Sequence, residues 1–138
     1  MKYSALNIQG RGELANEYVA FTSQTAHSLS FSVLPRSYYV AENAISPGAV
    51  DAFWFPNQLV KPGDSIILFT KAGLNTNRTD ASGVTSYFFY WGRPDSVWKN
   101  RESCAVLVDA ATWVTTQREA TPLQGIASLF RPDPNRSP

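Results

Sequence analysis

The side chains that could do chemistry in this chain are few and widely spaced. His27 is the only histidine and Cys104 the only cysteine among 138 residues. One histidine cannot build a multi-histidine metal site, and one cysteine excludes an intrachain disulfide and a multi-cysteine metal site. A Ser-His-Asp triad could use His27, but no Gly-x-Ser-x-Gly elbow accompanies it. We therefore predict no catalytic residue, and a hydrolase would require His27 to meet a carboxylate in one cleft.

The acidic side chains lie mostly at expected turns, where aspartates usually cap backbone amides. Those at expected turns are Asp51, Asp64, Asp80, Asp95, Glu102 and Asp109. A glycosidase pair depends on a spatial proximity that the sequence does not reveal. Asp80 follows Asn75 and Asn77, whose oxygens could bind calcium, but the spacing is not that of an EF-hand loop. We predict neither a metal nor a cofactor.

A group of basic residues between positions 71 and 101 is the strongest charge pattern. Five cations lie there, against three carboxylates in or beside the span. Cations beside an exposed aromatic ring are typical of surfaces for phosphate or single-stranded nucleic acid. The candidate binding residues are Lys71, Arg78, Arg93, Trp98, Lys99 and Arg101. The alternative is scattered solubilising charge around buried tryptophans, because a net charge of +1 gives no general attraction to anions.

Two aromatic segments carry further alternatives. Residues 53–55 (Phe-Trp-Phe) and 87–91 (Tyr-Phe-Phe-Tyr-Trp) could form an exposed platform for carbohydrate or a partner chain. Aromatic residues on strands also commonly fill a core. Cys104 lies within an apolar run, where a cysteine behaves as a small buried hydrophobic residue.

Short strands are expected to position these side chains, at residues 2–9, 16–22, 28–34, 37–41, 51–55, 65–70, 87–91, 104–108 and 112–116. In the clearest alternation Leu29, Phe31 and Val33 point inward and the intervening serines outward. Pro35 is expected to end that strand.

Several turns and loops are predicted between the strands. Glu17 is expected at the wet end of its strand. Pro62-Gly63 indicates a β-turn, and residues 71–85 read as one long loop. The ranges 104–108 and 112–116 are expected to pair as a closing hairpin.

The last residues change in character. Thr121-Pro122 is typical of a helix start, and Leu123, Ile126 and Phe130 then repeat at helical spacing. The sequence therefore predicts a short helix and a frayed end over residues 121–138, within the same domain as a β-domain at residues 1–120.

Bulk composition limits the class of protein. Apolar residues make up 43% of the chain, charged residues 17% and aromatic residues 13%, which fits one folded, strand-rich domain. No run of about 18 apolar residues predicts a membrane span, and the first residues lack the apolar core of a signal peptide. We expect a cytoplasmic protein with no membrane contact.

Three segments together resemble the lamin tail domain family. They are residues 16–21 (Asn-Glu-Tyr-Val-Ala-Phe), residues 55–66 with their Pro-Gly-Asp turn, and residues 96–100 (Ser-Val-Trp-Lys-Asn) followed by residues 104–109. The resemblance covers roughly residues 3 to 116. It implies an immunoglobulin-like β-sandwich, generally non-catalytic, with contacts to proteins, DNA or chromatin.

We therefore expect an all-β, immunoglobulin-like antiparallel β-sandwich of about eight or nine strands with a short C-terminal helix. The expected function is a non-enzymatic protein-interaction or adaptor module that binds another protein or itself. The alternative is a nucleic-acid-binding module that uses the basic group at residues 71–101.

Overall fold

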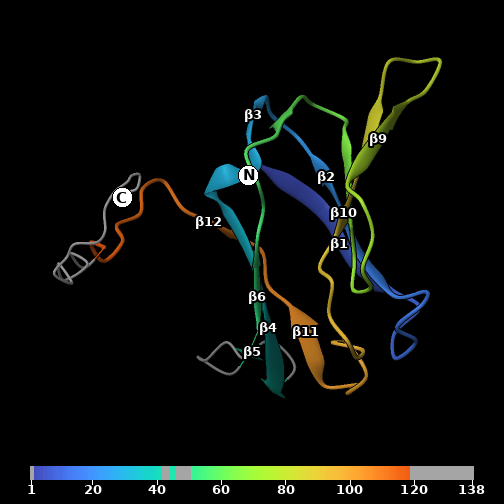
Figure 1. Ribbon diagram of the computed structural model, residues 1–138, viewed down its shortest axis with the longest axis vertical. Helices are drawn as coiled ribbons and strands as arrows, with labels where there is room; N and C mark the ends of the chain where they lie inside the picture. Colours follow the sequence, from blue (N-terminus) through green and yellow to red (C-terminus); the bar gives the residue numbers. More distant parts are fainter. Residues whose placement is uncertain (1, 42–43, 46–50, 119–138) are drawn as a thin grey trace, which may run out of the picture.

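The structure is a computed structural model that describes residues 2–41, 44–45 and 51–118. The described part is all-β, with twelve strand segments in two layers and one 3-10 turn, η1 (Figure 1). The strands are β1 (Tyr3–Gln9), β2 (Tyr18–Ser23), β3 (His27–Ser28), β4 (Ser32–Ala41), β5 (Ala44–Ile45), β6 (Ala52–Trp54), β7 (Leu59–Val60), β8 (Ser65–Phe69), β9 (Thr76–Thr79), β10 (Thr85–Tyr90), β11 (Ser103–Ala105) and β12 (Val108–Asp109). Four of these segments have only two residues, which explains why we expected fewer.

The large sheet has the strand order β1-β2-β8-β10-β9. Its pairs are antiparallel except β8 with β10, which run parallel. The prediction of purely antiparallel sheets was therefore wrong. The connection between β8 and β10 is long enough to return the chain to the start of the sheet. It also contains β9, so the long loop predicted at residues 71–85 is partly a strand.

The small sheet is built around β4, which pairs with β5, β6, β11 and β12. β4 continues through Pro35, so the predicted strand end there was wrong. Pro35 lacks an amide hydrogen, but its carbonyl accepts a hydrogen bond from the Val106 amide at 3.1 Å. The predicted hairpin of residues 104–108 and 112–116 was also wrong. Both β11 and β12 pair with β4 instead, and the described residues after Asp109 form no strand.

The turn η1 (Leu29–Phe31) reverses the predicted alternation of inward and outward side chains. Ser28 caps this turn, because its hydroxyl accepts a hydrogen bond from the Ser30 amide at 3.2 Å. Leu29 is buried as predicted, but the turn shifts the strand phase by one residue. Ser32 therefore has no exposed surface, whereas Phe31 is 39% exposed.

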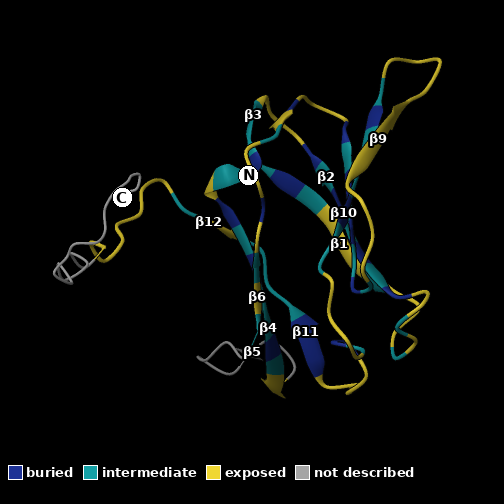
Figure 2. Ribbon diagram, in the orientation of Figure 1, coloured by how far each residue is buried: buried dark blue, intermediate teal, exposed yellow. Residues whose placement is uncertain are grey.

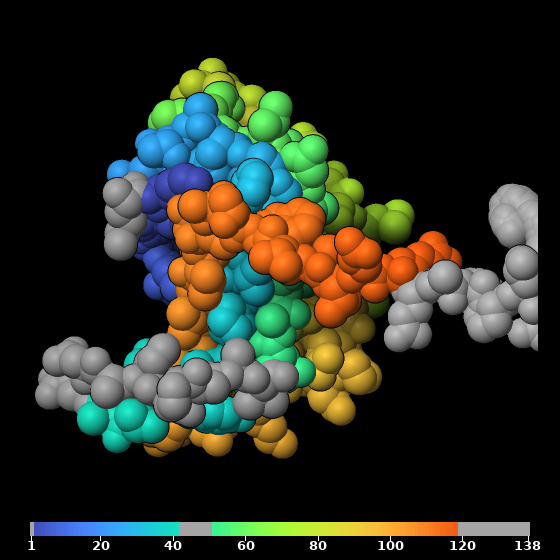
Figure 3. Space-filling view, turned by 90° about the vertical axis from the view of Figure 1, so that its left-hand side faces the viewer, coloured from blue at the N-terminus to red at the C-terminus, as the bar shows by residue number. Residues whose placement is uncertain are grey.

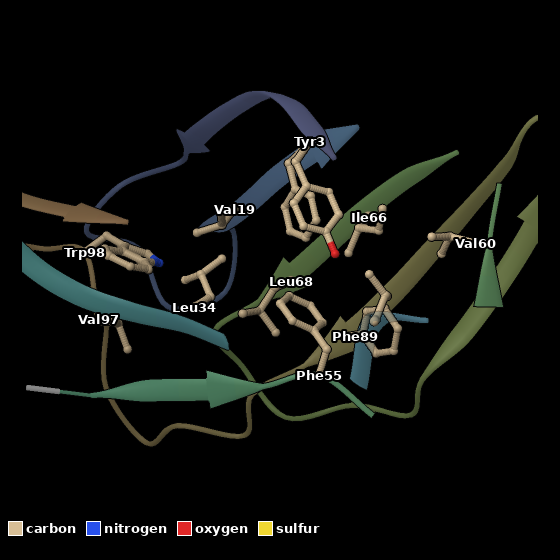
Figure 4. Close-up of a cluster of buried hydrophobic side chains, with 12 residues drawn as sticks. Tyr3, Val19, Leu34, Phe55, Val60, Ile66, Leu68, Phe89, Val97 and Trp98 are labelled. Atoms are coloured by element: carbon tan, nitrogen blue, oxygen red, sulfur yellow. The ribbon is translucent and has the colours of Figure 1, made fainter. Parts of the chain in front are cut away.

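In the part of the chain that the structure describes, twelve buried side chains form the core between the sheets, and most of them are shown in Figure 4. They are Tyr3, Val19, Phe21, Leu29, Leu34, Phe55, Val60, Ile66, Leu68, Phe89, Val97 and Trp98. Phe55 makes edge-to-face contacts with Phe21 and Phe89 at ring-centre distances of 5.6 and 5.5 Å. Each fully buried apolar side chain contributes about 2 kcal/mol, so this core is the main source of stability.

Cys104 is buried, as predicted, and burial raises the pKa of its thiol. The predicted helix at residues 121–138 lies outside the described residues. In the described ranges, no helix has the length and apolar character needed to cross a bilayer.

Candidate binding surfaces

The six predicted binding residues do not form one patch. Lys71 and Arg78 lie on the outer face of the large sheet. Arg93 instead forms an ion pair with Asp51 at 3.2 Å, and Asp51 also pairs with Arg36 at 3.0 Å. The Arg36 guanidinium in turn donates to the carbonyl oxygen of Val97 at 3.1 Å. The ion pair of Arg93 therefore links segments within the fold, through Asp51 and Arg36.

Trp98 cannot contact a ligand, because its side chain has no exposed surface. The prediction that its ring forms part of a binding surface was wrong. Its neighbours Lys99 and Arg101 are exposed, on the turn between Trp98 and β11. Arg11 holds this turn by donating from Nη1 to the carbonyl oxygens of Trp98 and Ser103, at 3.2 and 2.9 Å. We call residues 98–102 the tryptophan turn, and it is thus held in place by a side chain near the N-terminus.

The carboxylate of Glu17 joins the chain segments that meet beside Trp98. Its side chain has no exposed surface, so the expectation of a wet position was wrong. One carboxylate oxygen accepts hydrogen bonds from the Gly12 amide at 2.9 Å and the Ser96 hydroxyl at 2.5 Å. The other accepts from the Thr70 hydroxyl at 2.6 Å and the Val97 amide at 2.9 Å.

These bonds set the charge of Glu17. Burial by itself would raise the pKa of the Glu17 carboxyl, but the hydrogen bonds from Ser96, Thr70, Val97 and Gly12 outweigh it and hold the pKa below its ordinary value. The carboxylate is ionised and both of its oxygens are occupied. It therefore anchors the loops that meet here and is not available as a general base.

His27 lies on β3 and both ring nitrogens have partners. Nε2 lies 2.7 Å from the Tyr3 hydroxyl, and Nδ1 lies 3.0 Å from the Thr25 hydroxyl. The Tyr3 hydroxyl also bonds to Ser32 at 2.5 Å, and burial raises the pKa of Tyr3. Within the described part of the chain no carboxylate bonds to His27.

Two of the turn aspartates, Asp64 and Asp80, act as caps. Asp64 accepts hydrogen bonds from the amides of Lys61 and Thr85 at 2.9 and 3.1 Å. Asp80 accepts from the amides of Ser82 and Val84 at 2.9 and 3.1 Å. Among the described residues, no group of three or more His, Cys, Asp or Glu side chains could hold a metal ion.

The first candidate surface is a row of aromatic rings on the outer face of the large sheet. We call it the stacked face, and it consists of Tyr18, Phe69, Phe88, Tyr90, Lys71 and Arg78. The Phe69 and Tyr90 rings are nearly parallel at 5.1 Å, and Tyr18 lies 5.5 Å from Phe69. Lys71 Nζ lies 5.2 Å from the Phe69 ring centre, and Arg78 Cζ 5.9 Å from that of Phe88.

The sequence indicated the two cations of this face as binding residues, but it did not indicate Tyr18 and Phe69. The alternation of β8 carries the missing signal. Ile66 and Leu68 are buried, so Phe69 must point to the opposite side. The pairing of Phe69 with Tyr18 and Tyr90 on the neighbouring strands depends on register, which only the folded sheet supplies.

The second candidate surface covers the outer face of the small sheet. We call it the tryptophan face, and it consists of Phe31, Val33, Trp54, Val108 and Trp113. Val33 pairs directly with Trp54 on one side and with Val108 on the other. Figure 3 looks onto this side, where the chain from β12 onward (orange) crosses β4 and β6.

Both tryptophans of this face are about half exposed, Trp54 at 52% and Trp113 at 54%. Their rings meet edge to face at 5.3 Å and 87°. Trp54 Nε1 donates a hydrogen bond to the carbonyl oxygen of Ser30 at 2.6 Å, which fixes the indole in its place. The sequence indicated Trp54 as a candidate platform residue, but nothing in it connected Trp54 with Trp113.

Comparison with known proteins does not identify the chain. No family model, curated protein or solved structure matches it. The two surfaces must therefore be interpreted from their own chemistry.

Proposed function

We propose that the protein is a non-enzymatic interaction module that associates with a second copy of itself through the tryptophan face. The observation that carries this proposal is the pair of half-exposed tryptophans on an otherwise apolar row of the small sheet. Tryptophan is enriched among the residues that dominate the energy of protein–protein interfaces. A row of valine and tryptophan has no charge to define a polar ligand, and it matches a surface like itself.

Charge and chemistry support this proposal. The net charge of +1 produces little repulsion between two copies. A two-fold contact would bring the same row from both copies together and remove both tryptophans from water. The chemically reactive groups are occupied elsewhere, since Glu17, Asp64 and His27 all bond within the fold. We further propose that the sandwich is related to the lamin tail domains, a generally non-catalytic, immunoglobulin-like family.

Light scattering coupled to size exclusion, over a dilution series, tests this proposal. We expect a concentration-dependent dimer for the wild type and a monomer for Trp54→Ser combined with Trp113→Ser. The matched control is Leu59→Ser with Leu74→Ser, which removes two side chains exposed at 71% and 89% that lie outside the tryptophan face. This control should remain a dimer. A wild-type protein that stays monomeric at the highest concentration, or a tryptophan variant that still dimerises, would refute the proposal.

A further inference from the structure

We infer that a groove at the open edge between the two sheets binds a small amphipathic carboxylate, a molecule with an apolar chain and one carboxylate group. The groove lies between β1 (dark blue in Figure 3) and the segment that runs from β11 to β12 (orange). This inference goes beyond the proposed function, because it concerns a small molecule and because, in the described part of the chain, no residue of the tryptophan face lines the groove.

Two adjoining hollows form the groove. The larger has a volume of about 470 Å³, and its apolar walls come from Tyr3, Ala5, Leu6 and Leu107. The smaller has a volume of about 310 Å³, and its walls include Ile8, Ala105 and Arg11. Leu6 lines both hollows, so they are neighbours along β1. Each volume falls within the range of about 300 to 1,000 Å³ that is typical of sites for small ligands.

A β-bulge in β1 brings apolar side chains to this groove. Between Ser4 and Asn7, the two residues Ala5 and Leu6 lie opposite a single residue of β2. Ala5 adopts a φ of 58°, in the left-handed region that is unfavourable for a residue with a Cβ atom. Both residues of the bulge line the larger hollow, and Leu6 remains 39% exposed there, in the middle of β1 that Figure 2 shows in yellow. Strained backbone of this kind is common next to ligand sites.

The bulge is held by a side chain, and it favours a small ligand over a peptide. Asn7 Nδ2 donates a hydrogen bond to the carbonyl oxygen of Ala5 at 2.8 Å. A bulge on an edge strand disfavours pairing with a further strand. An extended peptide would therefore find no regular edge to pair with along β1, whereas a small molecule needs only the hollows.

The charges along the groove favour one carboxylate at the end near Arg11. In the larger hollow, Lys2 Nζ lies 3.2 Å from Asp109 Oδ1, so these two charges neutralise each other. Arg11 is the one charged residue among the described residues that line the smaller hollow, and no described carboxylate pairs with it. Within the same ranges only its Nη1 donates hydrogen bonds, all to oxygens of residues 98–103. Nε and Nη2 therefore remain to bind a carboxylate, which arginine does through two parallel N–H donors.

An apolar chain with one carboxylate matches both the walls and the charge of the groove. Burial of the chain against Leu6 and Leu107 provides the apolar part of the affinity. A neutral apolar molecule would leave the donors of Arg11 without an acceptor, and an alkylammonium ion would be repelled by the guanidinium.

A titration of the isotope-labelled protein with decanoate near neutral pH, followed by NMR, tests the inference. We expect saturable shifts of the backbone amides of β1 and of residues 105–107. Leu6→Glu should weaken binding by about tenfold or more, because it places a negative charge in the groove. The matched control is Leu59→Glu, which adds the same charge at a side chain that is 71% exposed and lies outside the groove, and which should bind decanoate as tightly as the wild type. Circular dichroism verifies that both variants are folded.

Two further ligands separate the charge from the apolar contact. Decanol should bind about tenfold more weakly than decanoate, because it lacks the charge-assisted hydrogen bonds to Arg11, and decylammonium should bind more weakly still. The inference is overturned if decanoate causes no saturable shifts in β1, or if its shifts centre on the indole signals of Trp54 and Trp113. It is also overturned if Leu59→Glu loses as much affinity as Leu6→Glu, or if decylammonium binds as tightly as decanoate.

Discussion

The tryptophan turn and the tryptophan face place the same residue type in opposite environments. Trp98 has no exposed surface, and the loop around it is held by Glu17 and Arg11. Trp54 and Trp113 are half exposed and are held by one hydrogen bond and by each other. Trp98, which lies near charged residues in the sequence, belongs to the core, whereas Trp54, which lies between two phenylalanines, is at the surface.

The two regions differ in how much free energy is lost when their contacts within the fold are opened. The end around Trp98 contains an ionised carboxylate whose bonding partners come from three distant parts of the chain. Opening it would leave several polar groups without partners. The tryptophan face would lose little on contact with a partner and would gain apolar burial. The first site therefore determines stability, and the second is available for binding.

Removing the carboxylate of Glu17 should have the largest effect. We expect Glu17→Ala to lower the free energy of unfolding by about 5 kcal/mol, because it leaves buried donors of Thr70, Ser96 and Val97 unpaired. Chemical denaturation measures this change. Glu13→Ala is the matched control, since Glu13 is exposed and its side chain, among the described residues, bonds only to the side chain of Asn16. A loss at position 17 no larger than at position 13 would contradict the structural role of Glu17.

Truncating the two kinds of tryptophan should sharpen the comparison. Trp98→Ala should destabilise the protein by about 4 kcal/mol, as expected for a buried tryptophan. Trp54→Ala should cost less than about 1 kcal/mol, because half of its surface is already in water. Thermal denaturation of both variants measures the difference. Equal losses would mean that the tryptophan face belongs to the core of the folded protein.

Arg11→Ala should have an intermediate effect. The guanidinium bonds to carbonyl oxygens of Trp98, Asn100 and Ser103, and we expect a loss of about 2 kcal/mol from these charge-assisted bonds. Arg101→Ala, on the same turn, serves as the control and should change stability by less than about 0.5 kcal/mol. Urea denaturation measures the free energy of unfolding of both variants. Similar losses in the two would show that Arg11 does not hold the turn in place.

Acid should weaken the part of the molecule around Glu17. The pKa of Glu17 is lower in the folded protein than its ordinary value of 4.5, so the unfolded chain binds a proton more readily. The stability that this carboxylate provides is complete above that value and is lost as the pH falls through the folded-state pKa. The melting temperature should therefore stay level down to about pH 5 and then fall. The fall should be shallower in Glu17→Gln, and an equal slope in both proteins would exclude Glu17 as its source.

The layer architecture was largely predictable from the sequence, and the details that failed have identifiable causes. Alternating apolar residues indicated most strands, and the turn at Pro62-Gly63 forms as predicted, with a φ of 90° at Gly63. A three-residue turn at Leu29–Phe31 reversed the phase of the clearest pattern, which no periodicity can reveal. The parallel pairing of β8 and β10 depends on a connection whose path is not encoded in local alternation.

The candidate surfaces were predictable only in part, because they depend on long-range register. Lys71 and Arg78 were chosen from charge, but their neighbours Phe69 and Phe88 come from two strands that are paired only in the folded sheet. Glu17 was expected at the wet end of its strand and is buried instead. Its burial could not be inferred, because the donors that permit it come from residues 12, 70 and 96–97. Local sequence thus indicates which way a side chain points, while distant segments determine what it meets.

The parallel pairing of β8 with β10 also has a consequence for how the chain folds. The two strands cannot pair with each other until the intervening connection has closed, and contacts between segments distant in the sequence form slowly. During that delay Ile66–Phe69 and Tyr87–Tyr90 are two exposed apolar segments with high strand propensity. Refolding at high protein concentration should therefore compete with aggregation through these segments, and dilute refolding should give the higher yield.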